Sequence, residues 1–409
     1  MTLFTRCIAI FLFGLVIPAF AQEKKKWTPP PAEKLESLIS SDPGKAAEVI
    51  SKSWGEKSLK SGMCKWIEKR TVLWAVISDT PVSVFKAAEK GEKIGDLVSL
   101  DDKGLQAFAT TFEDPIAFNY VIKRADGTKL GAGSTVKIEY YDYAPESEHQ
   151  EGVPQGKVTR YEWNDSKNFP NTLREYEVYI PAQYDGSEPA ALMVFQDGLR
   201  HADPNSNGGL RAPVVFDNLI AAKKMPVTIG VFINPGRKAD QKPGAKPGNR
   251  SFEYDSLGDQ YVRFLLEEII PYVVKEHDLK LSDDPKMWGI SGGSSGCACA
   301  WTAAWERPDK FGKVLGWVGT FVDIRGANAY PSLVRKTERK PIRAALLDGT
   351  QDLDNRFGNW PLANQQMETA LEFAGYDYKY WWGKGFHGSR HMAAMMPEML
   401  TWLWSDEVK

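Results

Sequence analysis

The chain has 409 residues and a formal net charge of −2, with Lys and Arg scattered along its whole length. A chain of this length exceeds what one hydrophobic core usually covers, so two domains are expected. The scattered charge lacks the basic patch that attracts phosphates, which excludes nucleic acid as an expected partner.

The first 21 residues have the pattern of a secretory signal peptide. A positive charge at Arg6 precedes an apolar run from Cys7 to Phe20, and the run ends in Ala19-Phe20-Ala21. The pattern predicts cleavage after Ala21 and export to the periplasm or the extracellular space. The apolar run, about 14 residues, is shorter than the roughly 20 that a membrane-spanning helix needs. No later segment is long and apolar enough, so no membrane span is expected.

Three cysteines remain after this cleavage, namely Cys64, Cys297 and Cys299. Two of them lie two residues apart in a stretch expected to be helical, where their side chains diverge. A disulfide framework is therefore not predicted, even for an exported protein.

Residues 22–64 are expected to form a tether and short helices. The charged, proline-rich start shows no periodicity, as in a tether, and apolar residues then recur at helical spacing on both sides of Asp42-Pro43-Gly44. Residues 65–163 change to short β-rich runs separated by turn residues, for example 71–77, 106–112, 117–122 and 134–140. Several strands at this spacing predict an immunoglobulin-like β-sandwich.

Residues 164–409 alternate strands with helices. Strands are expected at 176–180, 191–196, 227–233 and 287–291, and helices at 214–223, 259–275 and 295–306. Such alternation requires a mostly parallel sheet with helices on both faces. The predicted fold class is therefore α/β, preceded by a β-sandwich domain.

The segment from Gly292 to Gly296 reads Gly-Gly-Ser-Ser-Gly and has the spacing of a nucleophile elbow. In an elbow, a strained serine lies between a strand and a helix, and small residues two before and two after it allow the tight turn. The spacing also fits Ser291, but that choice shortens the strand and starts the helix on two glycines, which are poor helix formers. Ser294 is therefore the preferred nucleophile, and a loop without chemistry is the alternative for the motif alone.

An acid and a histidine should follow, because an α/β-hydrolase presents Ser, then Asp or Glu, then His along the chain. The apolar strand expected at 342–347 runs into a loop that contains Asp348, Asp352 and Asp354. Asp352 follows a tight turn predicted at Gly349 and is the preferred acid, with Asp348 nearer the strand and Asp354 further along the loop. These aspartates lack the ligand spacing and terminal glutamate of a calcium loop, so no metal is predicted.

The last strand is expected at 378–382, and the glycine-rich loop after it holds two of the five histidines of the chain. His387 directly follows the turn, and a base in a loop can be aimed at the serine. His391 is expected to open the terminal helix, where a cap or a supporting hydrogen bond is the simpler role. His387 is therefore the predicted general base.

Taken together, these segments resemble the enterochelin-esterase-like and carbohydrate-esterase group of α/β-hydrolases, which includes feruloyl and acetyl-xylan esterases. The resemblance covers residues 168–404 and rests on Val178-Tyr179-Ile180-Pro181, Phe195-Gln196-Asp197-Gly198, the run from Asn249 to Asp255, the elbow, and Asp352 with His387. It implies an α/β-hydrolase catalytic domain at 164–409 and fits an immunoglobulin-like domain at 65–163. Cys297 departs from the group, which commonly has a second glycine there.

The resemblance also places the oxyanion hole at the backbone amides of Ser295 and Leu199. It implies acyl transfer in two steps: Ser294 attacks an ester carbonyl with His387 as base, and water then hydrolyses the acyl-enzyme. This chemistry requires neither a metal nor an organic cofactor.

The resemblance implies a small-molecule or polysaccharide ester as substrate, among esters of carbohydrates, hydroxycinnamates and siderophore-like lactones. Arg325 and Trp360 lie in loops that could border the pocket, and a structural role is equally open for each. Two other functions stay open: binding of carbohydrate or cell envelope without catalysis, and acyl transfer to a sugar hydroxyl. The sequence sets no expectation for the oligomeric state.

Overall fold

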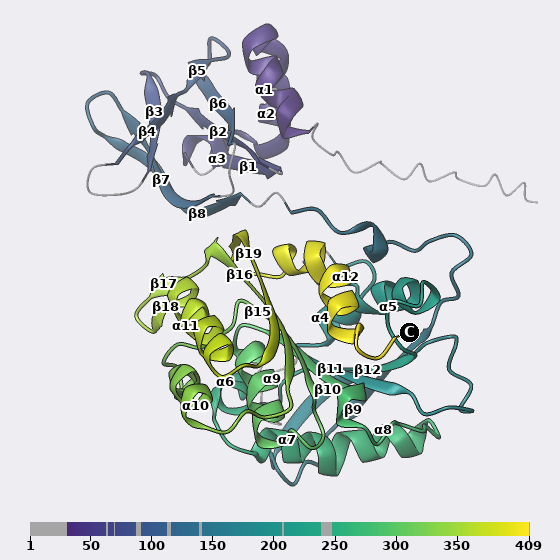
Figure 1. The fold of residues 1–409 in the computed structure, drawn as a ribbon. Coiled ribbons are helices and arrows are strands. Elements are labelled where there is room, and N and C mark those ends of the chain that lie inside the picture. Colours follow the sequence, from purple (N-terminus) through teal and green to yellow (C-terminus); the bar gives the residue numbers. More distant parts are fainter. Residues whose placement is uncertain are drawn as a thin grey trace, which may run out of the picture.

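The computed structural model describes residues 31–408, except 63, 69, 87–90, 113–115, 139–140, 207 and 239–247. The predicted signal peptide lies outside the described residues. Figure 1 shows a small N-terminal domain of helices and two sheets, followed by a larger domain built around one twisted sheet.

Three helices open the described chain: α1 (Ala32–Ser41), α2 (Pro43–Trp54) and α3 (Glu56–Lys60). The Asp42 side chain caps α2 by accepting a hydrogen bond from the Lys45 amide at 3.0 Å. Leu35 and Ile50, from α1 and α2, pack against Leu73 of the neighbouring sheet in one buried cluster. The two helices predicted around Asp42-Pro43-Gly44 therefore form part of the core of the first domain.

The strands of the first domain form two antiparallel sheets. Within the described residues, the first has the order β1 (Cys64–Glu68), β2 (Thr71–Ile77), β6 (Leu105–Thr111), β5 (Val98–Ser99). The second has the order β4 (Lys93–Asp96), β3 (Val82–Lys86), β7 (Ile116–Arg124), β8 (Lys129–Ile138). The immunoglobulin-like class of this domain stays a prediction.

The boundary predicted between the domains is wrong by one strand. β9 (Lys157–Trp163) was expected to end the sandwich, but it pairs antiparallel with β10 (Thr172–Ile180) along its whole length. Exposed and half-buried residues alternate along β9, as in any strand with one solvated face. Such a pattern predicts a strand but does not say which sheet it joins.

The second domain contains one large sheet. In the described part of the chain its strand order is β13-β10-β12-β11-β14-β15-β16-β19, with β9 beside β10. Neighbours from β12 to β19 are parallel. The bounds are β11 (Ala191–Gln196), β12 (Thr228–Ile233), β13 (Arg237–Lys238), β14 (Trp288–Gly293), β15 (Lys313–Trp317), β16 (Arg343–Gln351) and β19 (Asp377–Phe386). The predicted α/β fold with a mostly parallel sheet is confirmed.

Helices cover both faces of this sheet (Figure 1). One face packs against α6 (Arg250–Asp255), α7 (Gln260–Phe264), α8 (Ile270–Glu276), α9 (Ser295–Glu306), α10 (Tyr330–Lys336) and α11 (Trp360–Phe373). The other packs against α4 (Leu199–Ala202), α5 (Ala212–Ala221) and α12 (Arg390–Trp404). A separate ladder joins β17 (Asp354–Asn355) to β18 (Gly358–Asn359). Every residue of β11 and β12 is buried, as expected for parallel strands covered on both sides.

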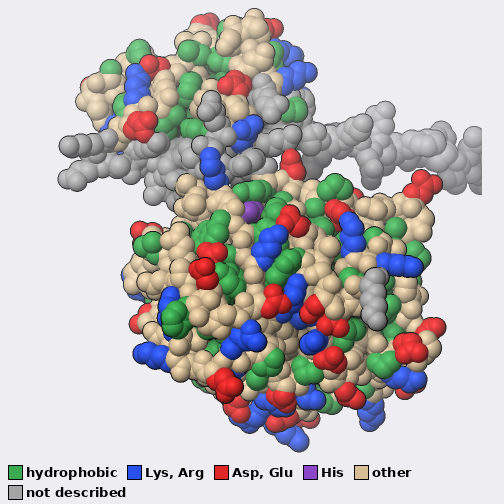
Figure 2. Space-filling model, viewed as in Figure 1, with side chains coloured by type: hydrophobic (Ala, Val, Ile, Leu, Met, Phe, Trp, Pro, Cys, Tyr) green, Lys and Arg blue, Asp and Glu red, His purple; other side chains and the backbone are tan. Residues whose placement is uncertain are grey.

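Acidic and basic side chains are interspersed over the face of the molecule shown in Figure 2. Among the described helices, none has the length and apolarity needed to cross a bilayer. The carboxyl ends of the parallel strands meet at one edge of the sheet, which is where open α/β sheets bind their ligands.

Candidate active site

Ser294 lies on a sharp turn between β14 and α9. Its backbone has φ 59° and ψ −126°, a conformation that L-residues rarely adopt. The Ser294 amide donates to the Trp317 carbonyl of the adjacent strand at 3.0 Å, which fixes the turn against the sheet. Ser291, the alternative nucleophile, is a fully buried residue within β14. The turn therefore presents Ser294 and not Ser291.

Two glycines make the turn sterically possible. A Cβ atom on Gly292 would lie 2.4 Å from the backbone of Gly296, and one on Gly293 would lie 2.3 Å from the Trp317 indole nitrogen. Cys297, which departs from the resembling group, is accommodated by Gly316 of β15, where an added Cβ would lie 2.4 Å from the Cys297 sulfur. Helix α9 thus packs closely on the sheet despite the larger side chain.

The three side chains predicted to act together form one hydrogen-bonded chain. The imidazole Nε2 of His387 lies 2.8 Å from the hydroxyl oxygen of Ser294. Its Nδ1 lies 2.6 Å from Oδ1 of Asp352. His387 follows β19 and Asp352 follows β16, so the ends of three parallel strands supply the chain. The side chain of Asp352 is fully buried, while 19% of the His387 side chain is exposed toward the cavity described below.

The alternative residues lie elsewhere. His391 opens α12, as predicted, and stacks on the Tyr141 ring with centroids 4.1 Å apart. Asp354 is exposed in β17. Asp348 is fully buried within β16. The strand β16 runs on through Gln351, but its pairing with β19 is irregular between Gly349 and Gln351, and the Asp352 amide donates to the Gly349 carbonyl at 3.1 Å, so the chain turns there as predicted. Gly349 is required because an added Cβ would lie 2.2 Å from the Gly385 carbonyl of β19.

Trp360, one of the two predicted pocket residues, contacts the hydrogen-bonded chain. Its ring meets the His387 imidazole edge-on, with centroids 5.6 Å apart, and its Nε1 donates to the Thr320 hydroxyl at 3.3 Å. The Thr320 hydroxyl in turn lies 3.2 Å from that of Ser294. Arg325 is not among the cavity-lining residues; it is exposed, and its Nε donates to the Ser251 hydroxyl at 3.3 Å.

A cavity of about 400 Å³ opens over Ser294 and His387. Its remaining lining residues are Asp197, Arg200, His201, Asn234, Pro235, Arg250, Gly293, Trp317, Val318, Gly388 and Ser389. Burial lowers the pKa of His201 to about 4, so this imidazole is neutral at pH 7. Besides the histidines, the charged side chains in the lining are two arginines and one aspartate.

Asp197 and Arg250 form a bidentate ion pair in the wall of the cavity. Arg250 Nε lies 2.9 Å from Oδ1 of Asp197, and Nη2 lies 2.7 Å from Oδ2. The Asp197 amide donates to the Tyr254 hydroxyl at 3.1 Å, which fixes the loop after β11 against α6. A fork of this kind fixes both side chains in orientation as well as in position.

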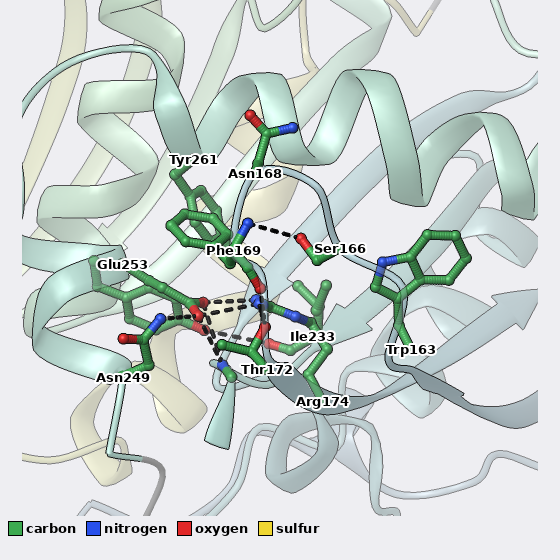
Figure 3. A network of polar contacts seen from close by, with 12 residues as sticks. Trp163, Ser166, Asn168, Phe169, Thr172, Arg174, Ile233, Asn249, Glu253 and Tyr261 are labelled. Carbon is green, nitrogen blue, oxygen red and sulfur yellow. Dashed lines mark hydrogen bonds and ion pairs between the residues drawn. The ribbon is translucent and has the colours of Figure 1, made fainter. Parts of the chain in front are cut away.

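Behind this pair, a second and fully buried ion pair anchors helix α6 (Figure 3). Arg174 Nη1 donates to Glu253 Oε2 at 2.6 Å, and neither side chain is exposed. Glu253 also accepts from the Gly236 amide at 3.1 Å and from Asn249 Nδ2 at 2.8 Å. Because Asn249 directly precedes Arg250, this network fixes the residue that clamps Asp197.

The two predicted oxyanion-hole amides lie on opposite sides of Ser294 in the sequence. Ser295 is the first residue of α9, where backbone N–H groups have no acceptor within the helix. The Leu199 amide, at the start of α4, donates to the Asn234 side-chain oxygen at 3.3 Å. A long bond of this kind is weak, and Leu199 stays a predicted donor.

No cluster of three or more His, Cys, Asp or Glu side chains suited to a metal ion occurs in the described ranges. Cys297 and Cys299 are free and buried. Burial raises the pKa of both thiols, so neither is a thiolate at pH 7.

Sequence reasoning assigned no role to Arg200, Arg250 or His201. Arg200 lies directly after the Asp197-Gly198 segment and Arg250 in the Asn249–Asp255 run, and both segments carried the family resemblance. The family resemblance identified these two segments. It did not indicate which of their side chains face the cavity.

The family model Esterase ("Putative esterase") matches residues 167–386. No match emerged among curated protein sequences.

Solved structures give the same fold. The enterobactin esterase of Shigella flexneri, solved with 2,3-dihydroxy-N-benzoyl-serine, is 15% identical with a TM-score of 0.58, over 88% of this chain and 99% of that one. Ferric enterobactin esterase of Salmonella typhimurium is 14% identical with a TM-score of 0.57, over 87% and 99%. At these identities the likeness shows the fold alone.

Proposed function

Because the chain belongs to the Esterase family and is a carboxylic ester hydrolase, we propose that it cleaves its substrate by a serine mechanism with Ser294 as nucleophile. The observation that carries the proposal is the continuous hydrogen-bonded chain from Ser294 through His387 to Asp352, at 2.8 and 2.6 Å. In this arrangement the base is within reach of the proton it removes, and the carboxylate orients the base.

The reaction proceeds through an acyl-enzyme. His387 Nε2 takes the Ser294 proton as the hydroxyl oxygen attacks the ester carbonyl, and the imidazolium then protonates the departing alcohol. Water, activated by the same imidazole, hydrolyses the acyl group. The Ser295 amide, and the Leu199 amide once Asn234 releases it, donate to the oxyanion in each tetrahedral intermediate, at about 2.7–4 kcal/mol for one such donor.

The charged side chains of the cavity indicate which esters the protein prefers. Arg200 is exposed and, within the described residues, forms no ion pair, whereas Arg250 is neutralised by Asp197. One unpaired cation in the wall of the cavity that also holds Ser294 attracts an acidic group on the substrate. Among esters of carbohydrates, hydroxycinnamates and siderophore-like lactones, we therefore favour those with a carboxylate or an acidic hydroxyl near the ester.

The N-terminal region is part of the same proposal. We propose export, supported by the signal-peptide pattern of residues 1–21. We propose an immunoglobulin-like class for the first domain, supported by the sheet orders β1-β2-β6-β5 and β4-β3-β7-β8. These are the orders ABED and C′CFG of immunoglobulin sheets when the strands are lettered along the chain.

An ester panel tests the catalytic proposal. The purified protein and its Ser294→Ala variant are assayed on acetyl, feruloyl, glucuronoyl and catecholate-lactone esters. We expect hydrolysis by the wild type only. Hydrolysis that survives in Ser294→Ala contradicts the serine mechanism, and binding without turnover on the whole panel favours a binding protein. Less free acid with an added sugar acceptor, together with an acylated sugar, indicates a transferase.

Matched esters test the charge preference. The panel includes pairs that differ by one carboxylate, on the acyl side in one pair and on the alcohol side in another. We expect the charged member of at least one pair to have the higher kcat/KM and to lose about fivefold in Arg200→Ala, since an exposed charge pair contributes up to about 1 kcal/mol. Equal kcat/KM values within both pairs contradict the preference.

A further inference from the structure

A second carboxyl group lies buried directly behind the triad. Asp348, near the end of β16, is fully buried, as is the side chain of Asp352 four residues later. The Asp348 Oδ1 atom accepts a hydrogen bond from the Gly349 amide at 2.7 Å. The Asp352 Oδ1 atom holds the His387 ring. One oxygen of each carboxyl group therefore has a partner.

The second oxygen of each carboxyl group has no hydrogen-bond partner among the described residues. Oδ2 of Asp348 and Oδ2 of Asp352 are both buried and, among the described residues, neither receives a hydrogen bond from a donor. Two ionised carboxylates can only accept hydrogen bonds, so they cannot satisfy each other. The two side chains are within hydrogen-bonding reach of each other. One proton shared between them gives both Oδ2 atoms a hydrogen-bond partner, because a protonated carboxyl group donates.

We propose that Asp348 is a neutral carboxylic acid that donates a hydrogen bond to Oδ2 of Asp352 and so positions the triad carboxylate for His387. Asp348 is then a positioning residue that acts through Asp352. The inference rests on the proposed triad mechanism.

The ionisation of Asp348 agrees with this geometry. Burial and the neighbouring Asp352 raise the pKa of Asp348 to about 9. A second negative charge beside Asp352 is thereby avoided at pH 7. The proton stays on the group that has no contact with the imidazole.

The groups that face Asp348 from other elements are uncharged at pH 7. Cys297 of α9 is a thiol, and burial, together with Asp348, raises its pKa further. Tyr380 of β19, whose pKa burial also raises, donates to Asn364 Oδ1 at 2.5 Å. Asn364 of α11 donates to the carbonyls of Gly319 and Trp360, both at 2.9 Å. Its amide also lowers the pKa of Asp348, but less than burial and Asp352 raise it. None of the described groups that act on Asp348 is a cation that would compensate an Asp348 carboxylate.

The arrangement makes a prediction about pH. Above about pH 9 Asp348 loses its proton, and the hydrogen bond to Asp352 is replaced by repulsion. Asp352 then loses the donor that holds its Oδ2 atom and orients it toward His387. Activity should therefore decline above about pH 9, and the cause is the deprotonation of Asp348.

The test compares Asp348→Asn, which keeps a donor without a titrating proton, with Asp348→Leu, which has neither. kcat and KM are measured from pH 5 to 10.5. We expect Asp348→Asn to retain kcat within threefold at pH 7 and to lose the alkaline decline. Asp348→Leu should lose kcat at least tenfold with KM little changed. A decline that persists in Asp348→Asn, or equal losses in both variants, overturns the proposal.

A spectroscopic measurement keeps the test independent of activity and of the Leu variant. The infrared difference spectrum of wild type minus Asp348→Asn at pH 7 should contain the carbonyl band of a protonated carboxyl group. Its absence overturns the proposal. If Ser294→Ala remains active, the triad mechanism fails while the band is still present, so the two failures are distinguishable.

Discussion

The indole ring of Trp360 lies edge-on to the imidazole of His387, and its N–H donates to the hydroxyl of Thr320. Since that hydroxyl lies 3.2 Å from Ser294 Oγ, one buried tryptophan contacts both the base and the neighbour of the nucleophile. Trp360 begins helix α11, which also carries Asn364. The helix therefore connects the triad with the carboxyl group buried behind it.

We predict that Trp360→Phe lowers kcat by about 3- to 10-fold with little effect on KM. The variant keeps an aromatic edge against His387 but loses the bond to Thr320, and a hydrogen bond of this kind contributes about 0.5–1.5 kcal/mol. Steady-state kinetics on the best ester of the panel measures the effect. Trp360→Leu, which also loses the aromatic edge, should fall further, and a kcat unchanged in both variants would contradict the role.

Replacement of Ser294 by glycine should abolish activity and stabilise the fold. The φ of 59° at Ser294 is a strain of about 1–3 kcal/mol that glycine relieves. We expect Ser294→Gly to unfold at a higher denaturant concentration than Ser294→Ala, by about 1 kcal/mol in the free energy of unfolding. The matched control is Ser291→Gly in the extended strand, which should be destabilised; the same sign at both positions would argue against strain at the turn.

Removal of the buried charge on Glu253 should lower the free energy of unfolding. Glu253→Gln leaves Arg174 buried without its partner, which costs about 3–5 kcal/mol in the free energy of unfolding, as measured by urea titration. The exposed pair Arg307–Asp309 is the control, and Asp309→Asn should cost under about 1 kcal/mol. Comparable small losses in both variants would show that the network in Figure 3 does not anchor α6.

Two buried histidines should make the fold sensitive to acid. Burial lowers the pKa of His201 and of His391 to about 4 from the ordinary 6.5. Above pH 6.5 both are neutral in the folded and unfolded chains. As the pH falls from 6.5 to 4, the unfolded chain binds protons that the folded chain does not, so stability falls.

The variant His391→Gln removes one of these two groups. We expect the difference in unfolding free energy between pH 7 and pH 4 to shrink by about 2–3 kcal/mol relative to wild type. Urea unfolding at a series of pH values measures it, and His277→Gln, at a half-buried histidine, is the comparison. An identical pH dependence in His391→Gln and wild type would show that His391 is not buried as a neutral ring.

The sequence predicted the residues whose position follows from local pattern. Ser294 was identifiable because a strand, small residues and a helix must surround an elbow, and His387 because a loop follows the last strand. Asp352 was preferred over Asp348 because it follows the turn at Gly349, where the Asp352 amide donates to the Gly349 carbonyl at 3.1 Å.

Contacts between distant segments could not be predicted in this way. Asp197 and Arg250 are far apart in the sequence, and their fork depends on how α6 packs over the sheet. The sheet that β9 joins and the role of Asp348 likewise depend on tertiary contacts. A single sequence gives the type of an element more readily than its partner.

Covalent trapping tests the central claim most directly. The wild-type protein is treated with a serine-directed fluorophosphonate, and the adduct is located by mass spectrometry of peptides, with Ser294→Ala and Ser291→Ala treated in parallel. The account predicts one adduct per chain, on Ser294, present in Ser291→Ala and absent in Ser294→Ala. An adduct on another residue of the wild type, or labelling that persists in Ser294→Ala, would contradict it.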